Sequence, residues 1–402
     1  TGETPTSAGG LLERLQVALA GDEPHLLVLD GLERVQAEGT TGRPRGELED
    51  PQLRRLVRWL AAGQGTRTRA LVTSRFPLVD LDDWKHAGHR EERLEDLEPA
   101  AARAVLRGWG VQGDDATLDG LAAPLGYHAL SVAVLGSYLG KLWGGDPTKA
   151  PTFDRGELAA ADPNAAKLTR ILTHYAEKLP DAERDLLARL STFPRGVTVE
   201  FLGFLIDAGG QIAGALAGCN VSRLRMLLEQ LRDLGLVFRY DAAHETTFTA
   251  HPFLRDYFRE LLVVTKHEEI HEAVRVRLVP SLETKPERKP TDPIVLDRYE
   301  RLIEVSRMAG QEEKALDLYW NGLGGYLHLG DKLGDYARGM RVLSPFVFAD
   351  ESVERTTRKK DATTRALLLS QFARYARRLG DLASALRALR QSIDIWNANL
   401  CE

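Results

Sequence analysis

The sequence predicts a multidomain, mainly α-helical protein with an α/β part at its N-terminal end. Two short apolar runs bounded by turn residues lie within residues 1–88, which is typical of strands in a parallel sheet. Beyond Leu94, apolar residues recur mostly at helical spacing. Gly310 and Gly380 each precede an Ala by five residues and are 70 residues apart, about two periods of a 34-residue helix-pair repeat.

The composition of the 402 residues, with 43% apolar and 28% charged, is typical of a soluble globular protein. A net charge of -5 gives no global attraction to nucleic acid or to an anionic membrane. Cys219 and Cys401 have no companions at metal-ligand spacing, so we expect neither a disulfide framework nor a zinc site. No apolar run reaches ~18 residues and residues 1–10 lack a signal-peptide pattern, so we expect a cytoplasmic protein. Because no initiator Met is present, we expect the chain to begin inside a longer protein.

The pattern of residues 1–88 predicts part of an open α/β sheet. Helices are expected at Leu11–Ala20 and Gln52–Ala62, and strands at His25–Leu29 and Arg69–Thr73. A strand, helix and strand in this order predict a right-handed crossover between parallel strands. We expect the first strand to be fully buried, because its apolar run is continuous.

Three further domains are expected. Residues 89–150 contain three helical segments and predict a small helical domain, followed by a linker at Asp146–Pro163. Residues 151–264 predict a winged helix, because the amphipathic helix Val221–Leu234 is followed by a β-hairpin over residues 236–250. Residues 265–402 predict tetratricopeptide-like helical repeats, with a third helix pair around Leu327–Leu343 and further repeats missing.

Polar residues follow both predicted parallel strands. Asp30 comes directly after the first strand, where a carboxylate can hold Mg²⁺ through water, and Glu33 on the same rim could polarise an attacking water. The second strand ends in Thr73, and Arg75 comes two residues later, which would bring a hydroxyl and a guanidinium to the same crevice, where Arg can donate to phosphate oxygens. The alternative is that Arg75 pairs with a nearby surface carboxylate, Asp80 or Asp82.

Four segments together resemble the STAND class of NTPases, in particular their NB-ARC type. LLVLDGLE (26–33) resembles the Walker B segment of that family, and LVTSR (71–75) its sensor-1 segment with a phosphate-contacting Arg. GYHALSVAVLGSYL (126–139) is similar to the helical-domain motif that packs on adenine, although many relatives have Pro at the position of Ala129. AHPFLRDYF (250–258) resembles the winged-helix motif whose His reaches the β-phosphate of ADP.

The resemblance implies a partial P-loop-type sheet, ATP or ADP with Mg²⁺ as cofactors, and a nucleotide site with members on three domains. It assigns adenine contact to Gly126 and His128, and phosphate contact to His251. The family also needs a Gly-x-x-x-x-Gly-Lys-Ser/Thr loop before the Walker B strand, and Gly9-Gly10 is no substitute for it. We therefore expect this chain alone to bind nucleotide weakly and to be inactive as an ATPase.

Several alternatives stay open at this point. His128 and His251 could also be core or helix-cap histidines. His267 and His271 are one helical turn apart and could bind a metal, but a polar helix face is the simpler interpretation. The exposed face expected for Val221–Leu234 is mixed in charge, so DNA binding by the winged helix is not expected.

The functional prediction is a nucleotide-dependent signalling switch and slow ATPase. Its C-terminal repeats would sense a protein ligand, and its output would be self-association of an N-terminal effector that is absent here, in bacterial defence for example. A transcription regulator of the same class and a nucleotide-independent protein-binding scaffold are the alternatives. No membrane partner is expected.

Overall fold

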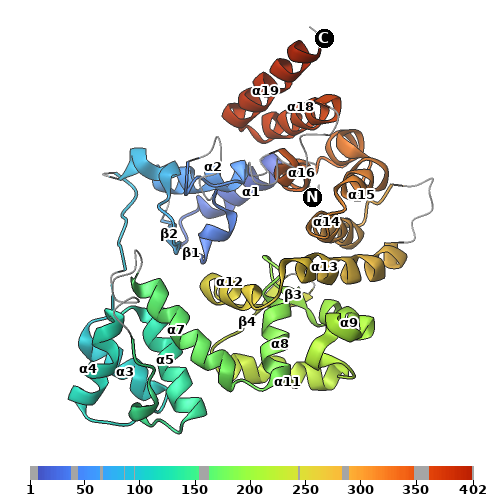
Figure 1. Cartoon of the computed structure of the whole chain (residues 1–402). Coiled ribbons are helices and arrows are strands. Elements are labelled where there is room, and N and C mark those ends of the chain that lie inside the picture. The colour runs from blue at the N-terminus through green and yellow to red at the C-terminus, as the bar shows by residue number, and fades with distance from the viewer. Residues whose placement is uncertain are drawn as a thin grey trace. The chain divides into compact units, whose positions relative to one another are not determined.

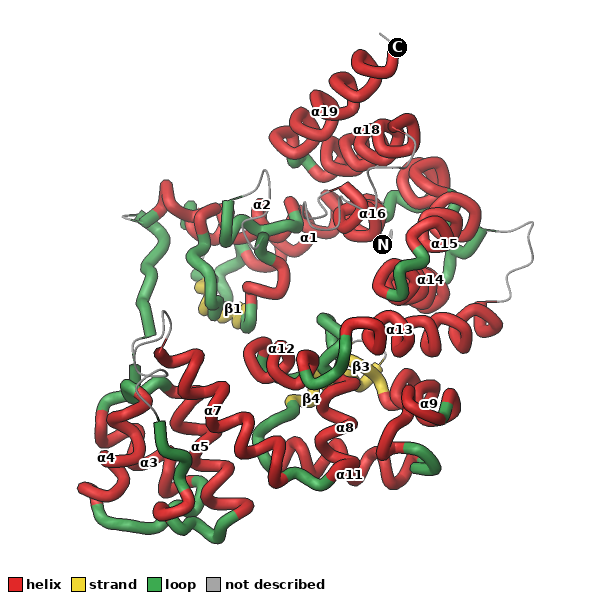
Figure 2. The backbone as a smooth tube through the Cα atoms, viewed as in Figure 1, coloured by secondary structure: helices red, strands yellow, loops and turns green. Residues whose placement is uncertain are grey.

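The structure is a computed structural model that describes residues 8–37, 44–63, 67–85, 87–94, 96–153, 163–242, 245–282, 289–347 and 362–400. The chain divides into two compact units. The first comprises Thr1–Glu92, Leu282–Glu304 and Glu312–Glu402, and the second comprises Arg93–Ser281 and Val305–Gln311. Helices make up most of both units and the strands are short (Figure 1 and Figure 2).

The first unit begins with a small α/β part. Its elements are α1 (Ala8–Leu19), β1 (Leu26–Leu29), the 3-10 helix η1 (Leu32–Val35), α2 (Pro51–Ala61), β2 (Arg69–Val72) and the 3-10 helix η2 (Val79–Trp84). β1 and β2 pair in parallel, with Leu26 opposite Arg69 and Leu29 opposite Val72. The predicted order of strand, helix and parallel strand is therefore confirmed.

The start of α2 follows from two neighbouring residues. The Asp50 carboxylate accepts hydrogen bonds from the backbone N–H groups of Gln52, at 2.7 Å, and Leu53, at 3.1 Å. Pro51 occupies the first turn, where its missing N–H would have no partner in the helix. Because both signals are local, the sequence predicts this boundary to within one residue.

The two faces of the sheet differ in burial. One face packs on a buried apolar core, to which Leu29 and Val72 add their side chains; the core consists of Leu32, Leu48, Val57, Ala61, Leu78 and Leu81. On the other face, Leu26 is 66% exposed, Val28 59% and Leu71 55%. The prediction of a fully buried first strand is thus wrong. Side chains alternate along a strand, and within the described part of the chain only one face is covered.

The helical repeats complete the first unit. They comprise α14 (Pro293–Met308), which extends into the second unit, α15 (Glu312–Asp317), the π-helical segments η7 (Leu318–Gly322) and η8 (Leu327–Lys332), α16 (Tyr336–Val347), α18 (Ala362–Leu379) and α19 (Leu382–Leu400). Gly310 and Gly380 have φ angles of 70° and 84°, in the left-handed region that favours glycine after a helix end. Both glycines therefore lie in turns between helices, as predicted.

The second unit contains helices and one small antiparallel sheet. Its first part has α3 (Pro99–Gly108), α4 (Asp115–Ala122), α5 (Ala129–Leu142) and the 3-10 helices η3 (Ala123–Leu125) and η4 (Pro147–Lys149). Gly136 and Gly140 of α5 lie against Trp109, and a Cβ at Gly140 would lie 1.9 Å from the Trp109 carbonyl oxygen. Glycine is therefore required for the close packing of α5 against the end of α3. The predicted linker Asp146–Pro163 falls partly outside the described residues.

The rest of the second unit contains the region predicted to be a winged helix, over residues 151–264, and the helix that follows it. Its elements are α7 (Pro163–Lys178), α8 (Asp181–Leu190), β3 (Val197–Thr198), α9 (Val199–Ala208), α10 (Gly210–Ala213), η5 (Gly214–Leu216), α11 (Val221–Asp233), β4 (Phe238–Ala242), β5 (Glu245–Thr249), α12 (Pro252–Glu260), α13 (Val264–Leu278) and η6 (Val279–Leu282). β3, β5 and β4 form an antiparallel sheet in that order, so the predicted helix followed by a hairpin is confirmed. Among the described helices of both units, none is long and apolar enough to cross a membrane.

Candidate functional site

The ends of β1 and β2 meet through Thr73. Its hydroxyl donates a hydrogen bond to Asp30 Oδ1 at 2.5 Å and accepts one from the backbone N–H of Gly31 at 2.8 Å. Its carbonyl oxygen accepts a hydrogen bond from Leu32 N at 2.9 Å. Gly31 has a φ angle of 71°, a conformation that lets the chain turn at once after Asp30. Asp30 remains exposed, with its carboxylate oriented by a side chain of the neighbouring strand end.

Glu33 and Arg75 form the second pair on this edge. Arg75 Nε lies 3.3 Å from Glu33 Oε1, and the two side chains are 45% and 16% exposed. The alternative prediction, that Arg75 pairs with Asp80 or Asp82, is wrong. Asp80 pairs with Arg54 at 2.8 Å, and Asp82 pairs with Lys85. The residues expected to polarise water and to contact phosphate thus neutralise each other in this arrangement.

The buried side chain of Gln36 links the loops that carry the residues of this edge. This side chain is 3% exposed, and its Oε1 accepts a hydrogen bond from Ser74 Oγ at 2.5 Å. Its Nε2 donates to the carbonyl oxygens of Gly46 at 2.7 Å and Pro77 at 3.2 Å. One buried amide therefore ties the loop after β2 to the loop after η1, and so fixes the spacing of the residues above it. The sequence offers no signal for Gln36, which is one polar residue within a polar loop.

This edge has the donors that a hard cation with phosphates prefers. The described residues contain no group of three or more His, Cys, Asp or Glu side chains that could hold a metal ion. A single exposed carboxylate, however, suits Mg²⁺, which keeps several waters and takes its other ligands from substrate phosphates. Asp30 fits that pattern, because Thr73 holds one of its oxygens and the group is open to solvent.

Gly126 and His128 precede α5 in the second unit. Gly126 and Tyr127 have φ angles of 61° and 57°, and Tyr127 is the one non-glycine residue with a positive φ in the described part of the chain. His128 Nδ1 accepts a hydrogen bond from the backbone N–H of Ser131 at 3.4 Å and lies 2.9 Å from Ser131 Oγ. His128 is thus a helix cap, the alternative that the sequence left open, and its contact with adenine stays a prediction.

His251 begins α12 in a similar way. Its Nδ1 accepts a hydrogen bond from the backbone N–H of Phe253 at 3.3 Å, and Pro252 follows in the first turn. The ring is half-buried. The cap accounts for a histidine at this position, whereas a phosphate contact by His251 stays a prediction.

His271 corrects the prediction of a polar helix face. The side chain is 1% exposed, and its ring meets that of Phe193 edge-on with centroids 4.9 Å apart. Burial lowers the pKa of His271 to about 4, against the opposing effect of a hydrogen bond with the backbone of Thr192. The imidazole is therefore neutral near pH 7. His267 instead lies with Nε2 3.0 Å from the Arg259 carbonyl oxygen.

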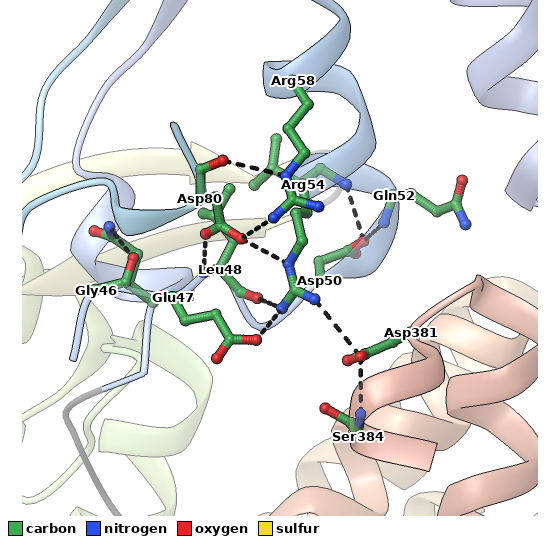
Figure 3. Close-up of polar contacts among 12 residues, drawn as sticks. Gly46, Glu47, Leu48, Asp50, Gln52, Arg54, Arg58, Asp80, Asp381 and Ser384 are labelled. Carbon is green, nitrogen blue, oxygen red and sulfur yellow. Dashed lines mark hydrogen bonds and ion pairs between the residues drawn. The ribbon is translucent and has the colours of Figure 1, made fainter. Parts of the chain in front are cut away.

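A second polar cluster joins the α/β part to the last two helices within the first unit (Figure 3). Arg54 of α2 lies between three carboxylates, with contacts of 2.8 Å to Asp80, 2.6 Å to Glu47 and 3.6 Å to Asp381. Only 11% of the Arg54 side chain is exposed, and for Asp80 and Asp381 the values are 2% and 1%. Beside it, Gln52 Nε2 donates to the carbonyl oxygen of the last residue of α18 at 2.9 Å. We call this set the Arg54 cluster.

Comparison with known sequences gives no match, either to a protein-family model or to a curated protein. Comparison with solved structures does give matches. The chain is similar to a STAND (Signal Transduction ATPase with Numerous Domains) protein with a tetratricopeptide repeat sensor from Pyrococcus horikoshii, with a TM-score of 0.51 and 14% sequence identity. The match covers 96% of this chain and 51% of that structure, so the chain spans about half the length of its structural neighbour.

At this identity the likeness concerns the fold. The chain has a STAND-like, mainly helical multidomain fold with small parallel and antiparallel sheets. This fold agrees with the class that the sequence motifs predict, while the NB-ARC type and the individual site residues stay predictions.

Proposed function

We propose that the chain is part of a nucleotide-dependent signalling switch of the STAND class, of the NB-ARC type. The observation that carries the proposal is the meeting of Asp30 with Thr73, and of Glu33 with Arg75, at one edge of a parallel strand pair. The carboxyl ends of parallel strands are where nucleotides bind in open α/β sheets. A STAND-like fold around this edge supports the assignment.

In this proposal ATP or ADP binds with Mg²⁺ beside Asp30. The cation supplies charge neutralisation at the phosphates. Thr73 holds the Asp30 carboxylate in one orientation, so little reorientation is needed on binding. Arg75 offers a permanent positive charge to the phosphate oxygens, and Glu33 accepts a proton from, or orients, an attacking water.

The ion pair between Glu33 and Arg75 sets a condition for this chemistry. At 3.3 Å the two charged groups satisfy each other, so Arg75 reaches a phosphate only when it leaves Glu33. An exposed pair of this kind contributes about 0–1 kcal/mol, which a phosphate contact can replace. The pair therefore suits a slow ATPase in which bound nucleotide rearranges the edge.

The remaining assignments extend the proposal to the other parts of the chain. Gly126 and His128 would contact adenine, and His251 would contact the β-phosphate of ADP in a closed state. The helical repeats would sense a protein ligand, in line with the repeat sensor named for the structural neighbour. The Arg54 cluster supports communication between the two functions, because α2 and the turn at Asp381 share buried charges. The output would be self-association of an effector, for example in bacterial defence.

The test is the amount of ADP and ATP that stays bound to the native protein after purification, measured by extraction and chromatography. We expect Asp30→Asn and Arg75→Ala each to lower the retained nucleotide at least tenfold. Arg90→Ala is the matched control, because Arg90 is an exposed arginine paired with an exposed carboxylate, Glu92.

An unchanged amount of retained nucleotide in Asp30→Asn and Arg75→Ala would refute the proposal of a nucleotide-dependent switch and favour a nucleotide-independent scaffold. Specific DNA retention by the native protein would instead favour a transcription regulator. Equal losses in Arg75→Ala and Arg90→Ala would show a general effect of charge and contradict a role for this edge.

A further inference from the structure

Arg45 lies over the ring of Phe76, in the loop that follows β2. Its guanidinium carbon is 4.5 Å from the centroid of the ring, and the guanidinium carbon of Arg75 is 5.8 Å from the same centroid. The two carbons are therefore at most 10.3 Å apart, the sum of these distances. Because Arg75 is the residue expected to contact phosphate, Arg45 brings a second permanent positive charge to the same edge.

The turn at residues 45–46 is held against the loop after β2 by two features. Gly46 has a φ angle of 93°, and a Cβ at this residue would lie 2.1 Å from the Pro77 carbonyl oxygen, so glycine is required for this close approach. Gln36 ties the same two segments together, because its Nε2 donates to the carbonyl oxygens of both Gly46 and Pro77. The position of Arg45 beside Phe76 therefore follows from the backbone packing of its own turn.

Among the described residues of this edge, Arg45 is the guanidinium without a carboxylate partner. Arg75 pairs with Glu33 at 3.3 Å. The Asp30 carboxylate is oriented by Thr73 and faces Mg²⁺ in the proposed function. Arg45 is exposed and has no hydrogen bond or ion pair within the described part of the chain. A phosphate thus reaches Arg45 without breaking an ion pair, whereas Arg75 must first leave Glu33.

We propose that Arg45 is a second anion-binding residue of this edge and contacts the phosphates of the nucleotide. A guanidinium can contact an aromatic ring with its face and donate to phosphate oxygens with the N–H groups on its rim. The contact with Phe76 restricts the orientations of the group, so less conformational freedom is lost when a phosphate binds. This role of Arg45 rests on the proposed function, because the ligand would be a nucleotide phosphate.

The test is the affinity of the native protein for methylanthraniloyl-ATP with Mg²⁺, measured by fluorescence titration. We expect Arg45→Gln to weaken binding about tenfold, because one charge-assisted contact is lost. Arg45→Lys keeps the positive charge but not the fork of N–H groups, so its affinity should lie between those of the parent protein and Arg45→Gln.

Arg55→Gln is the matched control. Arg55 lies on α2 of the same α/β part, and it too is exposed with no ion pair among the described residues. Its replacement removes the same charge and should leave the affinity unchanged. Urea unfolding of the same variants separates binding from folding, because Arg45 is exposed and its replacement by Gln should leave the urea midpoint at the parent value.

Three results would overturn the proposal. These are equal affinity of Arg45→Gln and the parent protein, equal losses in Arg45→Gln and Arg55→Gln, and a loss of affinity in Arg45→Gln that Arg45→Lys does not recover and that a lower urea midpoint accompanies. The first would leave a surface contact with Phe76, the second a general effect of charge, and the third a structural role.

Asp30→Asn, titrated in the same way, separates this role from the proposed function. If Asp30→Asn loses affinity and Arg45→Gln does not, the proposed function stands and only the role of Arg45 fails. If Arg45→Gln loses affinity and Asp30→Asn does not, the anion-binding role stands and the magnesium role of Asp30 fails. If neither variant loses affinity, both proposals fail.

Discussion

Replacement of Arg54 by Met should destabilise the first unit by about 3 kcal/mol, at the lower end of the ~3–5 kcal/mol for breaking a buried ion pair. The guanidinium is shared by two carboxylates that solvent hardly reaches, since Asp80 is 2% exposed and Asp381 1% exposed. Met fills a similar volume but leaves both charges without this partner. The destabilisation therefore comes from leaving two buried carboxylates beside an apolar side chain, and not from a loss of packing.

Remaining partners keep the expected cost at the lower end. Asp80 retains a hydrogen bond from the backbone N–H of Leu48 at 2.7 Å and an ion pair with Arg58 at 3.7 Å. Asp381 retains a hydrogen bond from the backbone N–H of Ser384 at 3.1 Å. Each carboxylate thus keeps some of the polar partners that stabilise its buried charge after Arg54 is removed.

Urea unfolding, followed by intrinsic tryptophan fluorescence, measures the effect, because Trp59 on α2 is one of the six tryptophans of the chain. With a slope of ~1–3 kcal/mol per molar urea, the midpoint should fall by about 1–3 M. Arg55→Met is the matched control, because Arg55 is the next residue of α2 and is exposed, and its effect should stay within ~0.5 kcal/mol. A double-mutant cycle of Arg54→Met with Asp381→Asn should give a coupling of about 1 kcal/mol.

Equal urea midpoints for Arg54→Met and Arg55→Met would refute the reasoning, because the loss of a buried arginine would then destabilise the protein no more than the loss of an exposed one. A coupling near zero would show that the 3.6 Å contact between Arg54 and Asp381 contributes no stability, even if Arg54 matters through Asp80.

Three further predictions concern the second unit. Because burial lowers the pKa of His271 to about 4, the unfolded state binds more protons between about pH 4 and 6.5, and stability should fall by up to about 3 kcal/mol as the pH is lowered through this window. His271→Phe should flatten that part of a plot of unfolding free energy against pH, and an unchanged slope would contradict the assignment. Gly140→Ala should destabilise the protein by about 1–3 kcal/mol, because the new Cβ would collide with the Trp109 carbonyl. Gly120→Ala, at a helical site with open space around it, should stabilise the protein by up to ~1 kcal/mol. Thermal unfolding compares the two variants. Burial raises the pKa of Tyr175 to about 12, so Tyr175→Phe should leave the folded protein's phenolate absorbance at pH 11 unchanged. A decrease equivalent to one ionised tyrosine would show that Tyr175 is accessible.

The boundaries of the helices and turns were the most predictable part of the fold. Asp50 and Pro51 mark the start of α2, and Gly310 and Gly380 mark turns between repeat helices, since each signal acts within one turn of the chain. The hairpin after α11 is predictable for the same reason, since it follows from a run of strand-forming residues on either side of a short turn.

The candidate site was predictable only in part. Parallel pairing of two short strands implies that Asp30 and Thr73 lie close together, and they share a hydrogen bond. The partner of Arg75 was not predictable, because Glu33, Asp80 and Asp82 are all within reach by sequence and only the path of the loop selects Glu33. For His271, a polar neighbourhood in the sequence concealed a buried ring.

The sequence by itself determined the order of the elements, the positions of Asp30 and Thr73 at the ends of their strands, and the turns at Gly310 and Gly380 between helices. Local hydrogen bonding and side-chain periodicity decide these features, and both act over a few residues. Tertiary structure alone decided which strand face stays in solvent and which charges meet. Gln52 and Leu379, 327 residues apart, lie within 2.9 Å, and beside them Arg54 compensates two buried carboxylates. Burial and Coulomb energy depend on distance in space, which separation along the chain does not fix.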